Sequence, residues 1–297
     1  MKQRVGLLLA GFALSAALAG ITRAPEKKHS PASAHEKHEG FALVWADEFN
    51  IDGRPDPANW AFENGFKRNN EAQWYQPDNA TVKDGMLVIE ARQERIENPN
   101  HDPGSDNWRS KRRFAEYTSA SLKTEGLHAW TYGRFELRAK IDIGPGLWPA
   151  WWTVGTARPW PGGGEIDMME YYRGDILANA CWKAPGGRWN QHWDTTKTPV
   201  ADLAEDGDTD AWARQFHVWR MDWTPESIDL YIDDRLLNTI DLAETVNPDG
   251  SNPFHEPHHM LINLAIGGTN GGDPAASSFP KRYEIDYVRV YQKMSGQ

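Results

Sequence analysis

Residues 133–140 read GRFELRAK, and this stretch decides the fold class. From Phe135 to Lys140, apolar Phe, Leu and Ala side chains alternate with charged Glu, Arg and Lys side chains. Side chains of a β-strand point alternately to its two faces, so a period of two indicates one face in the core and one toward water. Half-buried strands of this kind are typical of antiparallel sheets. The stretch therefore predicts an antiparallel sheet that packs one side on a core.

Short apolar or alternating segments recur along the rest of the chain. Turn sequences such as residues 83–85 (KDG) and 233–235 (DDR) separate some of them, whereas helical periodicity is scarce and only residues 201–213 could hold a turn or two. Many short strands without alternating helices predict an all-β sandwich, and residues 41–293 contain no repeat or second linker, so we expect one domain. The other strand candidates are residues 42–45, 81–82, 86–92, 119–124, 217–223, 228–232, 260–264 and 283–291.

The N-terminus has the composition of an export signal. Lys2 and Arg4 form a short basic start, and residues 5–19 (VGLLLAGFALSAALA) are apolar and end on a small-residue Ala-Leu-Ala pattern. The run is short for a membrane span, which needs about 20 residues, and an uncleaved anchor is the alternative. We expect a signal peptide over residues 1–19, a flexible linker over residues 20–40, and a secreted protein, periplasmic or extracellular, with no membrane span after cleavage.

Composition narrows the class of partner. The chain has 297 residues with 15 Trp, 9 Tyr and a single cysteine, Cys181, which allows no internal disulfide. Loss of Lys2 and Arg4 with the signal peptide would leave 30 basic against 42 acidic side chains, and this balance argues against nucleic acid as a partner. The apolar faces of pyranose rings stack on flat aromatic rings, so the many tryptophans favour sugar binding; packing in the core is the alternative.

Residues 162–172, GGGEIDMMEYY, place three acidic side chains in an apolar run. In a strand Glu165 and Asp167 share a face, whereas Glu170 has the opposite parity. One extra residue, a β-bulge around the two methionines, would return Glu170 to the shared face, and such bulges are common beside active sites. Burying neighbouring carboxylates is costly, so catalysis or a metal site explains the cluster better than a structural role does.

Cleavage of a glycosidic bond uses such a set of carboxyl groups. A retaining mechanism needs a carboxylate that attacks the sugar carbon and a carboxylic acid that protonates the leaving oxygen, about 5 to 5.5 Å apart. We assign Glu165 as the nucleophile, Glu170 as the acid/base, and Asp167 as an assisting carboxylate that acts by hydrogen bonding and like-charge repulsion. A calcium site and plain surface acids are the alternatives, and the flanking glycines and apolar residues argue against surface acids.

The sequence resembles glycoside hydrolase family 16, in its laminarinase-like branch with a bulged ExDxxE motif. The acidic motif carries this resemblance together with residues 45–49, 69–75, 84–87, 132–136, 146–152 and 286–291. The resemblance implies a concanavalin A-like β-jelly-roll sandwich with a substrate groove on its concave sheet. It also implies endo-acting hydrolysis with retention, the same roles for Glu165 and Glu170, and no metal or organic cofactor in catalysis.

The resemblance also points to residues of the groove. Trp148 would lie against the sugar next to the cleaved bond, and Asn70 and Glu71 would hydrogen-bond hydroxyls on the donor side. Trp152 lies four residues after Trp148 and would share its face on a regular strand, whereas Trp151 would turn to the core.

Two further sets of residues are expected from their positions. Trp182 and His192 follow the catalytic strand at the point where the next strand should recross the groove, so we expect both to contact substrate. The resemblance implies a structural calcium held by Glu48, the Gly85 carbonyl and Asp286, and oxygen ligands suit this ion. The partner is a polysaccharide or glycan, and we expect a monomer.

Two features depart from the laminarinase pattern. Residues 267–273, GGTNGGD, lack the Trp that usually follows the Gly-Gly pair, and an insertion over residues 93–118 contains Trp108 and a basic run at 109–113. The insertion could form a groove wall that meets sulfate or carboxylate, or a solvated loop. β-1,3- or mixed-linkage β-glucan is the first choice of substrate, and a galactan, an agar-like polymer or a host O-glycan is the alternative. A non-catalytic carbohydrate-binding sandwich and a structural calcium-binding surface protein are the other classes.

Overall fold

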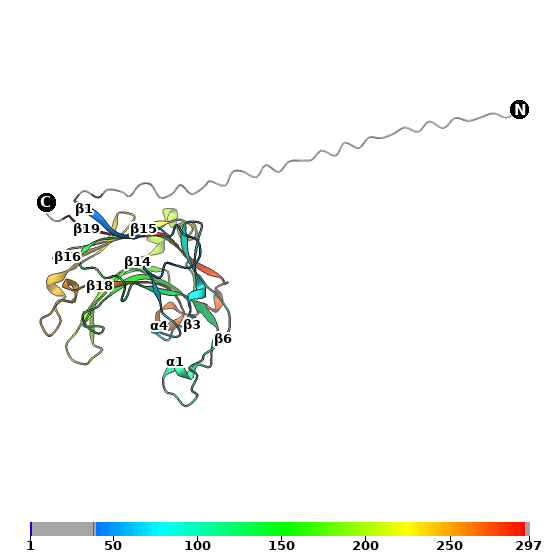
Figure 1. Ribbon diagram of the computed structural model, residues 1–297, viewed down its shortest axis with the longest axis horizontal. Helices are drawn as coiled ribbons and strands as arrows, with labels where there is room; N and C mark the ends of the chain where they lie inside the picture. Colours follow the sequence, from blue (N-terminus) through cyan, green and yellow to red (C-terminus); the bar gives the residue numbers. More distant parts are fainter. Residues whose placement is uncertain (2–37, 39, 295–297) are drawn as a thin grey trace. The chain divides into compact units, whose positions relative to one another are not determined.

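Two antiparallel sheets packed face to face form the folded part of the protein (Figure 1). The structure is a computed structural model that describes residues 1, 38 and 40–294. The expected signal peptide and almost all of the expected linker therefore lie outside the described residues. Within the described part of the chain, no helix is both long and apolar enough to cross a membrane.

The outer sheet has eight strands, and the strand that carries GRFELRAK lies inside it. This strand, β10 (Gly133–Ile141), pairs on one side with β15 (His217–Trp223) and on the other with β19 (Lys281–Lys293), both antiparallel. The other strands are β16 (Ser227–Ile232) and β17 (Arg235–Asp241) beyond β15, β5 (Met86–Ala91) and β4 (Ala80–Lys83) beyond β19, and β1 (Phe41–Asp47), which also pairs with β19.

The second sheet, here called the groove sheet, has seven strands and carries the acidic motif. Its order is β14 (Gln191–Pro199), β13 (Asp175–Lys183), β12 (Glu165–Tyr172), β11 (Leu147–Gly155), β18 (His258–Ile266), β9 (Ser121–Lys123) and β2 (Ala61–Phe62). The acidic motif lies on β12. This strand is paired with β13 on one side and β11 on the other, so the acidic side chains lie in the middle of the sheet and not at its edge.

Short elements connect and flank the two sheets. β3 (Gln73–Tyr75) pairs in parallel with β8 (Tyr117–Ser119), and β6 (Ile96–Glu97) pairs with β7 (Phe114–Ala115). The α-helices are α1 (Trp108–Lys111), α2 (Val200–Leu203), α3 (Thr209–Ala213) and α4 (Gly268–Gly271). The 3-10 helices are Pro77–Asn79, Glu205–Gly207, Leu242–Glu244, Pro253–His255 and Pro274–Ala276.

The hydrophobic core lies between the two sheets. From β10, Phe135, Leu137 and Ala139 are buried in this core, and Trp151 and Ile166 reach it from the groove sheet. The alternating pattern of residues 133–140 therefore marks one core-facing side, as predicted. The expected all-β sandwich is confirmed.

Candidate active site

The bulge predicted in the acidic strand is present in β12. Asp167 pairs with Asn179 of β13, and Glu170 pairs with Leu177, so three residue steps on β12 match two steps on β13. The register with β11 shifts at the same place. One extra residue in a strand reverses the parity of the residues after it, so Glu170 returns to the face that Asp167 occupies.

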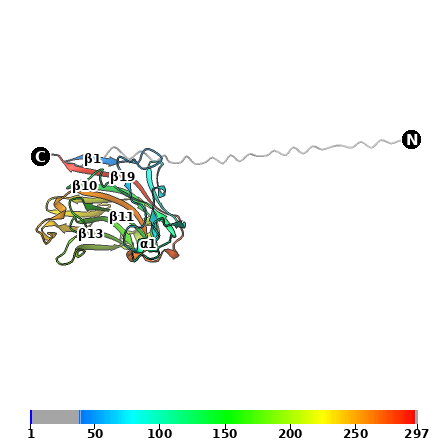
Figure 2. The ribbon, with the colours of Figure 1, turned by 60° about the horizontal axis from the view of Figure 1, so that its bottom comes forward.

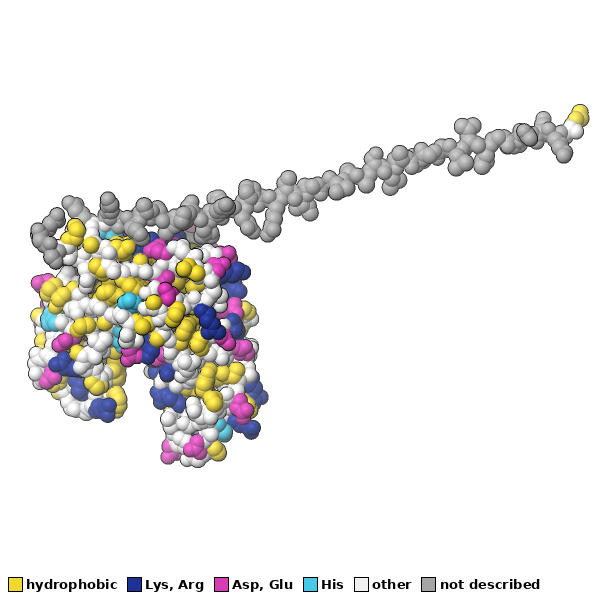
Figure 3. Space-filling model, in the orientation of Figure 1, with side chains coloured by type: hydrophobic (Ala, Val, Ile, Leu, Met, Phe, Trp, Pro, Cys, Tyr) yellow, Lys and Arg dark blue, Asp and Glu magenta, His cyan; other side chains and the backbone are white. Residues whose placement is uncertain are grey.

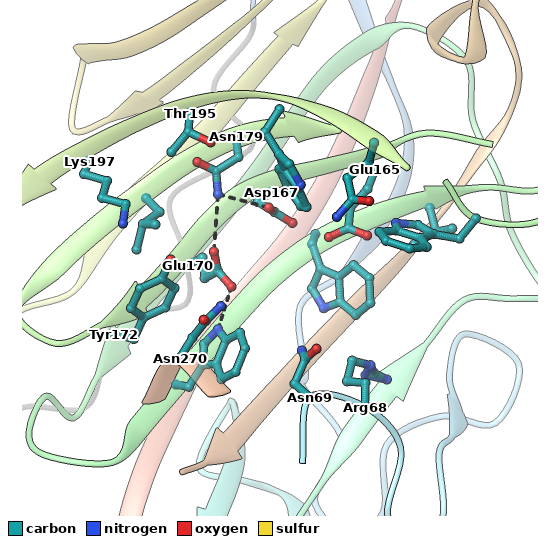
Figure 4. A pocket seen from close by; sticks show the side chains of 17 residues that line it. Arg68, Asn69, Glu165, Asp167, Glu170, Tyr172, Asn179, Thr195, Lys197 and Asn270 are labelled. Carbon is teal, nitrogen blue, oxygen red and sulfur yellow. Dashed lines mark hydrogen bonds between the residues drawn. The ribbon is translucent and has the colours of Figure 1, made fainter. Parts of the chain in front are cut away.

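The bulge separates the apolar and acidic side chains of β12. Ile166, Met168 and Met169 are fully buried in the core. The three carboxyl groups instead line one cavity of about 790 Å³ on the other side of the sheet (Figure 4). The remaining lining residues are Arg68, Asn69, Trp148, Trp152, Val154, Trp160, Tyr172, Leu177, Asn179, Gln191, Trp193, Thr195, Lys197 and Asn270.

Residues that pair across β12, β13 and β14 form rows that cross this part of the groove sheet. The rows are Glu165, Cys181 and Trp193; Asp167, Asn179 and Thr195; and Glu170, Leu177 and Lys197. The row of Glu165 therefore ends on an indole ring, whereas the row of Glu170 ends on an ammonium group. The two ends of the site differ in chemistry.

Two neutral donors hold the carboxyl group of Glu170. The indole Nε1 of Trp148 donates to Glu170 Oε1 at 2.6 Å, and Asn179 Nδ2 donates to Glu170 Oε2 at 3.3 Å. The same Asn179 nitrogen donates to Asp167 Oδ2 at 3.1 Å (Figure 4). Asn179 therefore bridges two of the three acids and fixes their relative position.

Burial raises the pKa of Asp167 to about 6 and the pKa of Glu170 to about 8. Repulsion from Asp167 adds to the rise at Glu170, and Trp148 and Lys197 oppose it. Burial, followed by repulsion from the other two acids, also raises the pKa of Glu165 well above its usual range. The cluster therefore retains protons at neutral pH. Because the pKa values of both glutamates shift in the same direction, these values do not distinguish a nucleophile from an acid/base.

The tryptophans of β11 point as expected. Trp148 and Trp152 line the cavity, whereas Trp151 is fully buried in the core. Trp152 Nε1 donates to Asn263 Oδ1 at 2.7 Å, and the guanidinium of Arg68 lies 5.0 Å from the centre of the Trp152 ring. Aromatic and cationic groups thus line the cavity together with the three acids.

The segment before β3 places its side chains differently from the prediction. Glu71 is buried and lines a smaller cavity that it shares with all three acids. Asn70 is exposed and lines neither cavity, and Asn69 lies there instead. Asn69 and Asn70 have φ angles of 53° and 54°, and two successive left-handed residues turn the chain so that strand parity does not apply. The prediction that Asn70 lies in the groove is therefore wrong, and the preceding residue, Asn69, lines the cavity.

Trp182 and His192 do not lie in the cavity. They pair across β13 and β14 with ring centres 5.6 Å apart, on the face opposite to Cys181 and Trp193, and Trp182 packs against the core. Parity is the physical reason, because side chains at adjacent positions point to opposite faces of a sheet. Trp193, which directly follows His192 and lines the cavity, was not among the residues predicted from the sequence.

The residues expected to hold calcium have other partners. Glu48 accepts from Arg289 Nε at 2.7 Å and Nη2 at 2.9 Å, and Asp286 accepts from Arg138 Nη1 at 2.6 Å. Among the described residues, no group of three or more His, Cys, Asp or Glu side chains could hold a metal ion. With each carboxylate paired to a guanidinium, these side chains do not fit a calcium site beside Gly85.

The insertion over residues 93–118 forms one wall of the cleft. Figure 3 shows a deep cleft between two arms, and α1 lies on one of them (Figure 1). Arg112 Nη2 donates to the Asn70 carbonyl at 2.9 Å and Arg112 Nη1 donates to the Glu71 carbonyl, while Arg109 Nε donates to the Lys67 carbonyl at 2.8 Å. These bonds tie the basic run of the insertion to residues 67–71. Figure 2 shows β10 and β19 of the outer sheet above β11 and β13 of the groove sheet.

Comparison with known proteins places this site in a family. The profile described as Glycosyl hydrolases family 16 matches residues 67–289. Over 279 residues the chain is 36% identical to a β-glucanase of Rhodothermus marinus, with 86% of this chain and 87% of that protein covered.

Solved structures agree with the sequence matches. The laminarinase catalytic domain of Thermotoga maritima superimposes with a TM-score of 0.70 at 32% identity, covering 86% of this chain and 100% of that one. A structure from a study of endo-acting O-glycanases, which human gut bacteria express to initiate mucin breakdown, superimposes with a TM-score of 0.77 at 33% identity, covering 86% and 92%. The chain therefore belongs to glycosyl hydrolase family 16 and is an endo-acting, retaining O-glycosyl hydrolase.

Proposed function

We propose that the enzyme cleaves β-1,3- or mixed-linkage β-glucan, with Glu165 as nucleophile, Glu170 as acid/base and Asp167 as the assisting carboxylate. The observation that carries this proposal is the bulge in β12, which turns all three carboxyl groups into one cavity. A strand without the bulge would send Glu170 into the core.

In the first half-reaction the Glu165 carboxylate attacks the anomeric carbon of the sugar. The bond from that carbon to the glycosidic oxygen breaks, and Glu170 gives its proton to the departing oxygen. In the second half-reaction Glu170, now ionised, takes a proton from water. The water oxygen bonds to the same carbon and releases the Glu165 carboxylate, so configuration is retained.

The neighbours of Glu170 suit this change of charge. Burial and the charge of Asp167 favour the protonated acid before the first step. The N–H groups of Trp148 and Asn179 favour the carboxylate that remains after proton transfer. These opposing influences leave the pKa of Glu170 at about 8, and an acid/base is most effective when its pKa lies near the pH at which the enzyme works.

The β-glucan assignment rests on the relatives and on the aromatic groove. The R. marinus relative is a β-glucanase, and Trp148 and Trp152 present flat rings in the cavity. The assignment is tested by incubating the enzyme separately with laminarin, lichenan, agarose and mucin O-glycans. Nuclear magnetic resonance then gives the anomeric configuration of the reducing ends that cleavage creates. We expect β-anomeric oligosaccharides from laminarin or lichenan; release from none of the four would favour a carbohydrate-binding protein without catalysis.

A second candidate substrate is a host O-glycan. The O-glycanase structure has the higher TM-score of 0.77, against 0.70 for the T. maritima laminarinase. Residues 267–273 also lack the tryptophan usual in laminarinases, and α4 begins there instead. Release of oligosaccharides from mucin glycans, with laminarin left intact, would select this candidate.

We also propose that the protein is exported and works as a monomer without a metal. The apolar run over residues 5–19 and its Ala-Leu-Ala end support export. N-terminal sequencing of the mature protein should give a sequence that starts at Gly20.

The monomeric state has its own test, because size-exclusion chromatography should give the mass of one chain. Activity should survive chelation of divalent ions, because the carboxyl groups alone supply the chemistry.

A further inference from the structure

Two tryptophans of the β13–β14 hairpin are unusually open to solvent. Trp189 is 59% exposed and Trp193 is 43% exposed, although the other tryptophans of the groove sheet are largely buried. Indole rings are large and apolar, and an exposed pair of them marks a binding surface more often than a packing need. None of the steps of hydrolysis uses either ring.

Both rings belong to the end of the groove that contains Glu165. Trp193 lines the main cavity and ends the cross-strand row that starts at Glu165. Trp160 lines the same cavity, and its ring centre lies 6.3 Å from that of Trp189 at an angle of 31°. Trp160 therefore connects the cavity, which Trp193 also lines, to Trp189 near the hairpin tip.

The hairpin tip is held in place before any substrate arrives. Lys183 Nζ donates to the carbonyls of Gly187 and Arg188 at 2.6 and 3.1 Å, and Asn190 Nδ2 donates to the Pro185 carbonyl at 3.0 Å. A tip with these internal bonds loses little conformational entropy on binding, which favours affinity.

Asn247 ties this hairpin to the segment that carries Trp160. Its side chain accepts from the Lys183 N–H at 3.0 Å and donates to the Gly162 carbonyl at 2.9 Å. The two loops that present the indoles are therefore fixed relative to each other.

We propose that Trp160, Trp189 and Trp193 form a sugar-binding subsite that extends from the Glu165 side of the cavity to the tip of the β13–β14 hairpin. It would take one or two pyranose rings of the glycan chain by stacking on their C–H faces. This inference rests on the proposed function, because it requires a glycan substrate. It predicts that affinity increases with chain length until this subsite is filled.

The test compares chain-length dependence in the whole enzyme. KM is measured for a series of three- to seven-sugar oligosaccharides from whichever polymer the wild-type enzyme cleaves. We expect Trp189→Ala and Trp193→Ala to raise KM for the longest oligosaccharide by about three- to tenfold, and to raise it less for the shortest. Trp189→Phe should restore most of the loss, because it keeps a flat ring.

The matched control is Leu236→Ala, which removes an exposed apolar side chain from β17 of the outer sheet and should leave KM unchanged at every length. An equal rise in KM at all lengths, or no rise at any, would overturn the subsite. If the proposed β-glucan substrate is wrong, the wild-type enzyme itself will not cleave β-glucan, and this result differs from loss of the subsite. Binding of the same series to Glu165→Gln, measured by calorimetry, gives a readout that does not depend on turnover.

Discussion

The indole Nε1 of Trp148 lies 2.6 Å from Oε1 of Glu170. This contact joins the ring expected beside the cleaved bond to the group proposed as acid/base. Trp148→Phe keeps an aromatic ring but removes the donor to a charged acceptor, which is worth about 1.5–3 kcal/mol. We expect kcat to fall by roughly 10- to 100-fold.

The same variant should move the alkaline limb of the pH profile to higher pH. Loss of the N–H donor destabilises the Glu170 carboxylate and so raises its pKa. Measurement of kcat/KM against pH checks this. An unchanged limb would mean that the indole does not act on Glu170.

Asp167→Asn should shift the same limb in the opposite direction. The acid/base must be protonated in the first step, so wild-type kcat/KM falls as pH rises through the Glu170 pKa of about 8. Asparagine removes the repulsion that raises this pKa, so the limb moves to lower pH. A limb that stays in place would refute the assisting role of Asp167.

Lys197→Met tests the cation at the other end of the Glu170 row. The ammonium lowers the pKa of Glu170, so its removal should raise that pKa and shift the alkaline limb to higher pH. Lys83→Met, on β4 of the outer sheet, is the control and should leave the profile unchanged. Equal shifts in both variants would point to a general effect of net charge.

Arg112→Ala tests the brace between the insertion and the segment that carries Asn69 and Glu71. Loss of its bonds to two carbonyls should loosen the groove wall and raise KM by about two- to tenfold, with a smaller change in kcat. Arg113→Ala is a close control, because the Arg113 side chain is 63% exposed and pairs with Glu97. If both variants behave alike, Arg112 is not a brace.

The arrangement of β12 could be predicted from the sequence, because its three acidic residues do not fit the alternation of one regular strand. Glu165 and Asp167 fit a regular strand and Glu170 does not, so only an extra residue could bring the three together, and β12 contains it. The orientation of Trp151 and Trp152 followed from parity in the same way.

Other parts of the site could not be predicted, for physical reasons. Residues 191–199, QHWDTTKTP, are largely polar and exposed, so no alternation marks which face Trp193 shares with the groove. The left-handed pair at Asn69 and Asn70 breaks parity before β3. The partner of Glu48 is Arg289, 241 positions away, and only the fold brings them together.

The most direct test of the central claim uses azide as an external nucleophile with an activated aryl β-glycoside of the sugar that the enzyme cleaves. Glu165→Ala with azide should give the α-glycosyl azide, because azide replaces the missing nucleophile in a single inverting step. Glu170→Ala should give the β-glycosyl azide, because azide then attacks the intermediate on Glu165. β-Azide from Glu165→Ala, or α-azide from Glu170→Ala, would contradict the assignment of these two residues.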